Sequence, residues 1–259
     1  MKKDLFFCLV ALFFGWVPQA SGRVTAITAQ GQCLSGLAGC FEISGVISNQ
    51  DFIEVRAIAD RNVANTKRTT LFWLNSRGGD VEAAIGIGRQ LRRLSAIAAI
   101  TSNEKCLSSC VFILAGATQR VIGGVVGIHR PYSLRIDQRD YAAIQKDQRR
   151  IATFAKTYLE EMNLPPQLYD AMVRVPPEKI RVLSEKELED FGLVQTDPVE
   201  QELQDDAGAR KYGLNKIEFL RRKAEVGQAC DSQWSVGRRT GNFDKYFRCK
   251  EQIMQGVSR

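Results

Sequence analysis

Two short segments carry residue types that could perform acid–base and nucleophilic chemistry. The chain has a single histidine, His129, which follows the apolar run 121–128 and precedes Arg-Pro. Histidine is the side chain whose ordinary pKa lies nearest neutral pH, and strand ends are where α/β folds gather their chemistry. A lone histidine is more often structural or merely exposed. Its place at the end of a predicted strand is what makes it a candidate general base.

The second segment is Cys106-Leu-Ser-Ser-Cys110, which leads into the apolar run 111–114. A serine at the start of a buried helix lies beside unpaired backbone N–H groups and the positive end of the helix dipole. Both suit the negative charge of a tetrahedral intermediate. The alternative is that Ser108 or Ser109 simply caps the helix, as serine commonly does.

The glycine pair Gly78-Gly79 follows the predicted buried strand 69–74. Glycine lets a backbone approach a ligand closely and expose its N–H group. The same pair equally fits a tight strand-to-helix turn. Neither glycine therefore indicates a site by itself.

The elements that must position these residues alternate between strand and helix patterns. We expect strands over 41–47, 69–74, 96–101 and 121–128, and helices over 51–66, after the cap Asp80, over 107–116 and over 138–162. This alternation predicts an α/β core with a mainly parallel sheet and flanking helices. A capping box at Ser184 opens a further short helix, which Gly192 ends.

Together these segments resemble the Clp protease/crotonase superfamily. The pattern comprises Leu74-Asn-Ser-Arg-Gly-Gly-Asp80, a serine opening an apolar helix, Gly127-Ile-His-Arg-Pro131, and Leu183-Ser followed by Gly192-Leu-Val194. Its order and approximate spacing are similar to those of the proteolytic subunit of Clp protease, over roughly residues 41–195. Cysteines two residues before and two after the serine resemble a family of predicted periplasmic Clp-like proteins.

The resemblance implies a serine hydrolase, most simply a peptidase acting on a peptide or protein. Ser108 matches the nucleophile and His129 matches the general base. Gly78 and the backbone N–H of Ser109 match the oxyanion donors. The acyl-transfer mechanism is then the usual serine–histidine one, with the histidine taking the serine proton and returning it to the leaving group.

The chain departs from the Clp pattern at three places. Arg77 stands where Clp protease has proline, and Ile180 stands where it has the aspartate of the triad. Glu178 is a candidate third member, and a serine–histidine dyad is the alternative. The third departure is the cysteine pair around Ser108. A bond between Cys106 and Cys110 is feasible if Cys106 precedes the helix, and we hypothesise that activity then depends on redox state.

The first residues predict a secretory signal peptide over 1–22. Lys2 and Lys3 precede the apolar run 5–17, and small residues follow at 20–22. The alternative is an uncleaved anchor, but a spanning helix needs about 20 apolar residues. We therefore expect export, to the periplasm if the source is Gram-negative. The Clp-like domain would cover 23–197, and residues 198–259 would be a charged linker over 198–214 and a small helical module from about residue 216.

Export changes the interpretation of the cysteines. Six remain outside the signal segment, and an even number in an exported chain indicates disulfides. Six cysteines allow 15 pairings. Proximity along the chain favours Cys33–Cys40, Cys106–Cys110 and Cys230–Cys249. A metal site is not expected, because the chain has no CxxC pair and its one histidine lies elsewhere; no cofactor is predicted.

Composition and charge limit the classes of partner that the chain is expected to bind. The 259 residues are 44% hydrophobic and 25% charged, as in ordinary globular proteins, with a formal net charge of +7. The basic residues are scattered, as at Arg149, Arg150 and 221–223, which favours solvated helix faces over a nucleic-acid site. At most peripheral contact with anionic lipid is expected. The amphipathic segment 138–162 offers a surface for a homo-oligomer, and no ATP-dependent unfoldase is expected for an exported chain.

Two other functions stay open. A catalytically inactive Clp-like scaffold or binding protein of the cell envelope is favoured by the missing aspartate, because fold does not imply function. Crotonase-type chemistry on acyl-CoA thioesters is disfavoured, because CoA is cytosolic and because the serine and histidine motifs are similar to the protease branch.

Overall fold

The computed structural model describes residues 22–26, 37–62, 69–132, 140–240 and 244–256. The strands are β1 (Arg23–Ala26), β2 (Gly39–Ile47), β3 (Thr70–Gly79), β4 (Ile97–Ile100), β5 (Lys105–Leu107), β6 (Gln119–Ile122), β7 (Val125–Ile128) and β8 (Arg181–Val182). The helices are α1 (Asn49–Asn62), α2 (Val81–Arg93), α3 (Cys110–Gly116), α4 (Tyr141–Glu161), α5 (Gln167–Val173), α6 (Glu185–Asp190), α7 (Pro198–Tyr212), α8 (Lys216–Ala229), α9 (Asp231–Thr240) and α10 (Asp244–Gln255). Residues 1–21 of the predicted signal peptide (1–22) lie outside the described residues.

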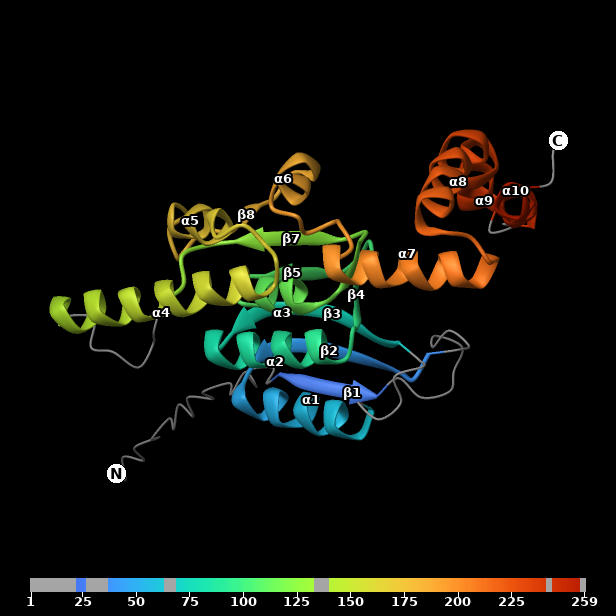
Figure 1. The fold of residues 1–259 in the computed structure, drawn as a ribbon. Coiled ribbons are helices and arrows are strands. Elements are labelled where there is room, and N and C mark those ends of the chain that lie inside the picture. Colours follow the sequence, from blue (N-terminus) through green and yellow to red (C-terminus); the bar gives the residue numbers. More distant parts are fainter. Residues whose placement is uncertain (1–21, 27–36, 63–68, 133–139, 241–243, 257–259) are drawn as a thin grey trace, which may run out of the picture.

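The predicted α/β fold with a mainly parallel sheet is confirmed (Figure 1). The strand order is β1-β2-β3-β5-β7-β8, with β4 and β6 branching from β3. All pairs formed within the set β2 to β7 are parallel. Among the described residues, antiparallel pairing occurs only where the outer strands β1 and β8 join β2 and β7. Helices α1, α2 and α3 pack on one another in chain order, and α3 lies against β3 and β5.

The branch in the sheet is what creates the site. The first half of β3 pairs with β4, but its end pairs with β5, through Ser76 and Cys106. The predicted strand 121–128 is likewise two strands, β6 beside β4 and β7 beside β5, separated by Gly123-Gly124. The ends of β3, β5 and β7 therefore lie next to one another at one edge of the sheet.

Three predicted boundaries were wrong for related reasons. The strand expected over 69–74 continues to Gly79, because the glycines keep pairing with β2. The helix expected over 107–116 begins only at Cys110, because residues 105–107 form β5. Residues 198–214, interpreted as a linker, form α7, which Asp197 caps through the N–H groups of residues 199 and 200 and which Gly213 ends in the left-handed region.

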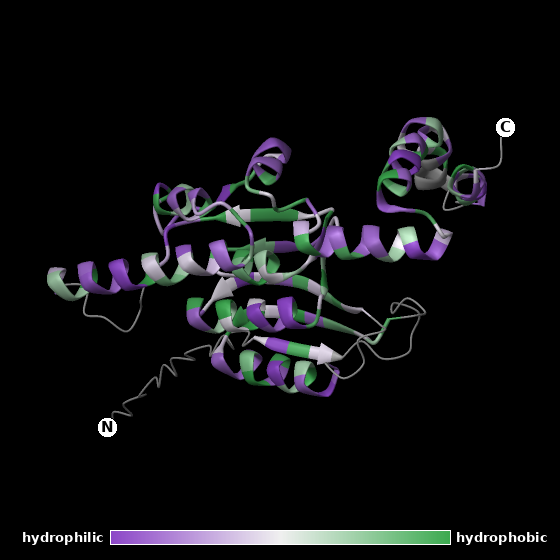
Figure 2. Ribbon diagram, viewed as in Figure 1, coloured by the Kyte–Doolittle hydropathy of each residue, from purple (hydrophilic) through white to green (hydrophobic). Residues whose placement is uncertain are grey.

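The main core forms where α2 and α3 cross. Gly88 and Gly116 face each other, and a Cβ at Gly116 would overlap the backbone of Gly88, so the two helices meet backbone to backbone. Tyr158 of α4 fills the space above Gly88, and its hydroxyl donates to the carbonyl of Phe112 at 2.7 Å. Figure 2 shows how hydropathy is distributed around this core: the strands carry hydrophobic residues, and the outer helices carry mixed or hydrophilic ones.

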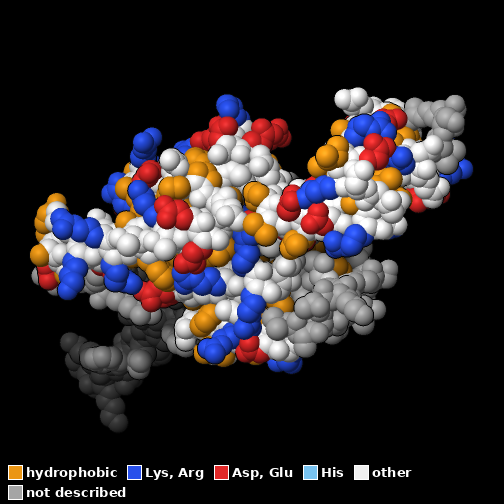
Figure 3. Space-filling model, viewed as in Figure 1, with side chains coloured by type: hydrophobic (Ala, Val, Ile, Leu, Met, Phe, Trp, Pro, Cys, Tyr) orange, Lys and Arg blue, Asp and Glu red, His pale blue; other side chains and the backbone are white. Residues whose placement is uncertain are grey.

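Helices α8, α9 and α10 form a module with a small core of its own (Figure 1). That core contains Phe219, Val226, Ile253 and the disulfide Cys230–Cys249. On the face shown in Figure 3, Lys and Arg side chains are interspersed with Asp and Glu side chains, so this face has no continuous basic surface. Within the described part of the chain, no helix combines the length and the apolar character needed to cross a bilayer.

The crossing of α2 and α3 predicts a steep cost for one methyl group. A Cβ at Gly88 would overlap the Tyr158 hydroxyl and lie 2.7 Å from the Phe112 carbonyl oxygen. We expect Gly88→Ala to lower the free energy of unfolding by about 1–3 kcal/mol, the usual cost of overpacking. The matched control is Gly123→Ala, whose Cβ would meet only ordinary contacts from 3.4 Å outward. Urea unfolding measures both; equal stabilities would contradict the close crossing.

The disulfides predict a specific peptide map. Cys106–Cys110 and Cys230–Cys249 are both bonded. Without reductant, the tryptic peptide 106–120 should be lighter by a pair of hydrogens and should resist alkylation. The peptide containing Cys230 should be linked to the one containing Cys249. Alkylation of any of these four thiols in the unfolded, unreduced protein would contradict the pairing. Cys40 is also bonded, but Cys33, its expected partner, lies outside the described residues.

Candidate active site

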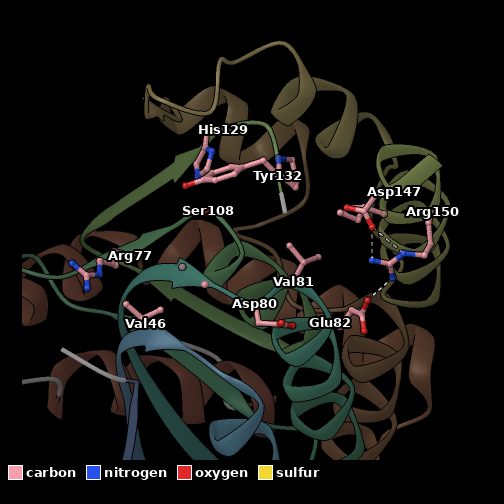
Figure 4. A pocket seen from close by; sticks show the side chains of 14 residues that line it. Val46, Arg77, Asp80, Val81, Glu82, Ser108, His129, Tyr132, Asp147 and Arg150 are labelled. Atoms are coloured by element: carbon pink, nitrogen blue, oxygen red, sulfur yellow. Dashed lines mark hydrogen bonds and ion pairs between the residues drawn. The ribbon is translucent and has the colours of Figure 1, made fainter. Parts of the chain in front are cut away.

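A cavity of about 490 Å³ opens at the edge of the sheet where β3, β5 and β7 end (Figure 4). Its floor is the Gly-Gly end of β3, and its walls come from the start of α2, the segment after β7, and α4. Both Ser108 and His129 line it. The lining residues are Val46, Arg77, Gly78, Gly79, Asp80, Val81, Glu82, Ser108, His129, Pro131, Tyr132, Asp147, Arg150 and Ile151.

Ser108 occupies the turn between β5 and α3. Its φ is +58°, in the left-handed region that non-glycine residues rarely adopt. The turn is fixed on both sides, since the Ser108 N–H donates to the Gly127 carbonyl at 2.8 Å and its carbonyl accepts from the Val111 N–H at 3.1 Å. A strained residue held this firmly and facing a cavity is typical of functional sites.

Ser109 has a different environment from its neighbour. It is buried, and its hydroxyl donates to the Gly79 carbonyl at 3.1 Å. Ser109 does not line the cavity, whereas Ser108 does. Of the two serine hydroxyls, the geometry therefore presents only that of Ser108 to a ligand in the cavity. Among the residues that the structure describes, no oxygen accepts a hydrogen bond from the Ser109 N–H.

Gly78 touches the serine directly. Its φ is +94°, and a Cβ there would lie 2.6 Å from the Ser108 Cβ and 2.8 Å from the Leu107 carbonyl oxygen. The Gly78 N–H, a predicted oxyanion donor, donates to the Ser76 hydroxyl at 3.0 Å, and that hydroxyl in turn donates to the Gly45 carbonyl at 2.7 Å. To bind an oxyanion, the Gly78 N–H would first have to leave Ser76.

His129 is buried, with 8% of its surface exposed. Its Nδ1 lies 3.0 Å from the carbonyl oxygen of Arg130, so the Nδ1–H donates there and Nε2 carries the lone pair. Burial lowers the pKa of His129 below its ordinary value, and the Arg130 carbonyl and the charge of Glu178 oppose that shift without reversing it. The imidazole is therefore neutral at neutral pH, as a general base must be.

The predicted third member takes no part in a hydrogen bond with the imidazole. Glu178 is exposed and acts on His129 only through its charge. Ile180, at the position of the missing aspartate, covers Gly127. No hydrogen bond joins Ser108 to His129 in the part of the chain that the structure describes, which is common in unliganded sites. The catalytic roles of all three residues stay predictions.

Charged residues that the sequence did not single out complete the cavity. Arg150 of α4 forms ion pairs with Glu82 and, at 2.8 Å, with Asp147. They lie on the opposite side of the cavity from Arg77 (Figure 4). For Arg150 and Asp147 the only signal was the polar face of the helix expected over 138–162, which gives no indication of what that face lines.

The turn that holds Ser108 is closed by the disulfide Cys106–Cys110, as the spacing suggested. Cys106 belongs to β5 and Cys110 is the first residue of α3, so the bond joins a strand to a helix across Ser108. Both cysteines are buried. In the described ranges no cluster of His, Cys, Asp and Glu side chains could hold a metal ion.

Comparison with known proteins gives structural neighbours only. No family model and no curated sequence matches the chain. The 1510-N membrane-bound stomatin-specific protease is similar over 62% of this chain and 80% of its own, with 15% identity and a TM-score of 0.47. A second structure of that protease, with a substrate peptide, aligns over 60% of this chain and 71% of its own, with 15% identity and a TM-score of 0.45.

ClpP1 from Listeria monocytogenes is similar over 60% of this chain and 88% of its own, with 17% identity and a TM-score of 0.46. At such identities and TM-scores the likeness assigns no activity. The function is therefore argued from the geometry of the cavity.

Proposed function

We propose that the protein is a serine hydrolase that cleaves peptide bonds by acyl transfer, with Ser108 as nucleophile and His129 as general base. One observation carries the proposal: a strained serine and a buried neutral histidine, 21 residues apart (129 − 108), line the same cavity. An imidazole whose Nε2 carries the lone pair can take a proton from a hydroxyl that faces the same cavity.

The reaction follows from the positions of the groups. The Ser108 Oγ attacks a carbonyl carbon while Nε2 of His129 takes its proton, and the imidazolium then gives that proton to the leaving amine. Water, activated by the same nitrogen, hydrolyses the acyl-enzyme. The oxyanion is bound by the Ser109 N–H at the start of α3, with the Gly78 N–H as second donor once it leaves the Ser76 hydroxyl.

The imidazole needs no carboxylate to hold its orientation here. The Arg130 carbonyl accepts the Nδ1–H at 3.0 Å and so fixes both the tautomer and the ring. Glu178 contributes a favourable charge for the imidazolium at longer range. The site thus works as a serine–histidine dyad supported by a backbone carbonyl.

A binding protein without catalysis is the second candidate. It is favoured by two features, the hydrogen bond that occupies the Gly78 N–H and the lack of one between Ser108 and His129 among the described residues. In that case the cavity would still bind an extended peptide but would not turn it over.

We further propose export to an oxidising compartment, which is the periplasm in a Gram-negative cell. Support comes from the bonded cysteine pairs, since such bonds persist outside the reducing cytosol.

Labelling with a fluorophosphonate tests the nucleophile. We expect intact mass to show one adduct on the folded, oxidised protein, because the probe reacts with activated serines. Ser108→Ala should abolish it, and His129→Ala should slow it by about a hundredfold or more. Ser109→Ala is the matched control: it removes a neighbouring hydroxyl but keeps the backbone N–H. Absence of any adduct on the wild type, oxidised or reduced, would favour the binding protein.

The pKa of His129 predicts the acid limb of the pH profile. Burial holds the pKa of His129 below its ordinary value of about 6.5. The labelling rate should therefore be close to its maximum at pH 7 and should fall only at pH values below about 6.5. Glu178→Gln removes a charge that raises the pKa, so the limb should move to lower pH while the rate at pH 8 changes less than about threefold.

A true triad carboxylate would behave differently. Loss of such a group costs several thousandfold in turnover. A loss of that size in Glu178→Gln would overturn the dyad. Glu185→Gln, on the exposed start of α6, serves as the control for a distant charge.

A further inference from the structure

The cavity is lined by one arginine, Arg77, that forms no ion pair with any described residue. Arg77 is exposed on β3, one residue before the Gly78 that touches Ser108. Among the described residues that line the cavity, it is the basic side chain without a carboxylate partner, whereas Arg150 is held by Glu82 and Asp147. An exposed guanidinium beside a catalytic serine is available to a ligand.

The opposite wall has the opposite charge. Among the described residues there, Glu82 and Asp147 bring two carboxylates to the one guanidinium of Arg150, which pairs with both. Figure 4 shows this wall on one side of the cavity and Arg77, beside Val46, on the other, with Ser108 and His129 between them. A ligand with a negative group is therefore attracted towards the end of β3 and repelled from α2 and α4.

We propose that Arg77 determines specificity by binding a carboxylate of the peptide substrate close to the scissile bond. This rests on the proposed hydrolase function and adds the substrate class: acidic peptides whose carboxylate lies on the β2–β3 side of Ser108. Guanidinium groups bind carboxylates with two parallel hydrogen bonds, which gives a defined position as well as affinity.

The position of Arg77 on β3 determines how far its side chain starts from Ser108. Neighbouring Cα atoms are 3.8 Å apart, so the Arg77 side chain starts one residue from the contact between Gly78 and Ser108. Side chains alternate along β3: Ser76 and Gly78 are buried, and Arg77 faces out. Because Arg77 nevertheless lines the same cavity as Ser108, its guanidinium is placed to contact a peptide bound there.

Two sources could supply the carboxylate. One is an aspartate or glutamate side chain within the peptide, and the other is the free carboxyl end of the chain. Both have the same chemistry, so the substrates must separate them. Four peptides suffice for each cleaved sequence: glutamate or glutamine near the bond, each with a free or an amidated end.

The experiment begins with the oxidised full-length protein and a mixed peptide library read by mass spectrometry. We expect cleaved bonds to be enriched in acidic residues, or in chain ends, at one fixed position. The matched peptides then give kcat and KM separately. Replacing the carboxylate by an amide should lower kcat/KM about tenfold, the effect of losing one charged hydrogen bond, mainly through KM.

Variants assign that preference to one side chain. Arg77→Ala should remove the difference between the acidic and amide peptides, and Arg77→Lys should restore part of it. Arg77→Glu should favour a basic residue at the same position. Arg56→Ala, an exposed arginine of α1 outside the cavity, is the matched control and should keep the wild-type preference.

The outcomes separate this inference from the proposed function. Fluorophosphonate labelling of Ser108 at the wild-type rate in Arg77→Ala shows that the nucleophile is intact. If labelling is intact but acidic peptides are not preferred, or if Arg77→Ala keeps the preference, the role of Arg77 is wrong and the hydrolase stands. If neither labelling nor cleavage occurs in the wild type, both proposals fail.

Discussion

The contact between Gly78 and Ser108 is the constraint on which the site depends. It exists because the end of β3 leaves β4 and pairs with β5 through Ser76 and Cys106. At this point the two segments approach so closely that a Cβ at Gly78 would lie 2.6 Å from the Ser108 Cβ, and both residues adopt positive φ. Glycine adopts this conformation without steric cost, but at a serine it costs of order 1–3 kcal/mol and persists only where the surroundings enforce it. Here the Ser76 hydroxyl holds the end of β3 to the Gly45 carbonyl, and the Gly127 carbonyl holds the Ser108 N–H.

The far end of α3 is held as firmly as the turn that precedes it. Buried Arg120 donates to the carbonyls of Leu114 and Ala115 in the last turn of α3, where the Leu114 carbonyl also accepts from the Ala117 N–H. The same guanidinium donates to the carbonyls of residues 192 and 195. Burial lowers the pKa of Arg120 to about 10, which still leaves it charged at neutral pH. With its carbonyls paired, α3 has little freedom to carry Ser108 away from Gly78.

The sequence indicated the parts of the site but not their contacts. The α/β class, the cap at Asp80 and the capping box at Ser184 follow from local patterns, and the structure has all three. Local patterns failed where strand pairing decided the outcome. Residues 105–107 are too few to show a strand period, and only their pairing with β3 and β7 makes them β5. The motif around Gly78 placed Arg77 near the cavity, but the place of Arg150 in the cavity depends on how α4 packs and could not be read from the sequence.

Packing around His129 and Gly127 explains why position 180 can lack the aspartate of the Clp pattern. Position 180 is exposed, and His129 already donates its Nδ1–H to the Arg130 carbonyl, so the imidazole has no further N–H for a carboxylate there. Ile180 instead packs on Gly127, whose carbonyl holds the Ser108 N–H. The apolar side chain thus packs behind the turn that holds Ser108. Because a backbone carbonyl orients the imidazole, substitution of the Arg130 side chain does not remove that hydrogen-bond acceptor. In the proposed mechanism, only the charge on the imidazolium is then left for Glu178 to stabilise from a distance.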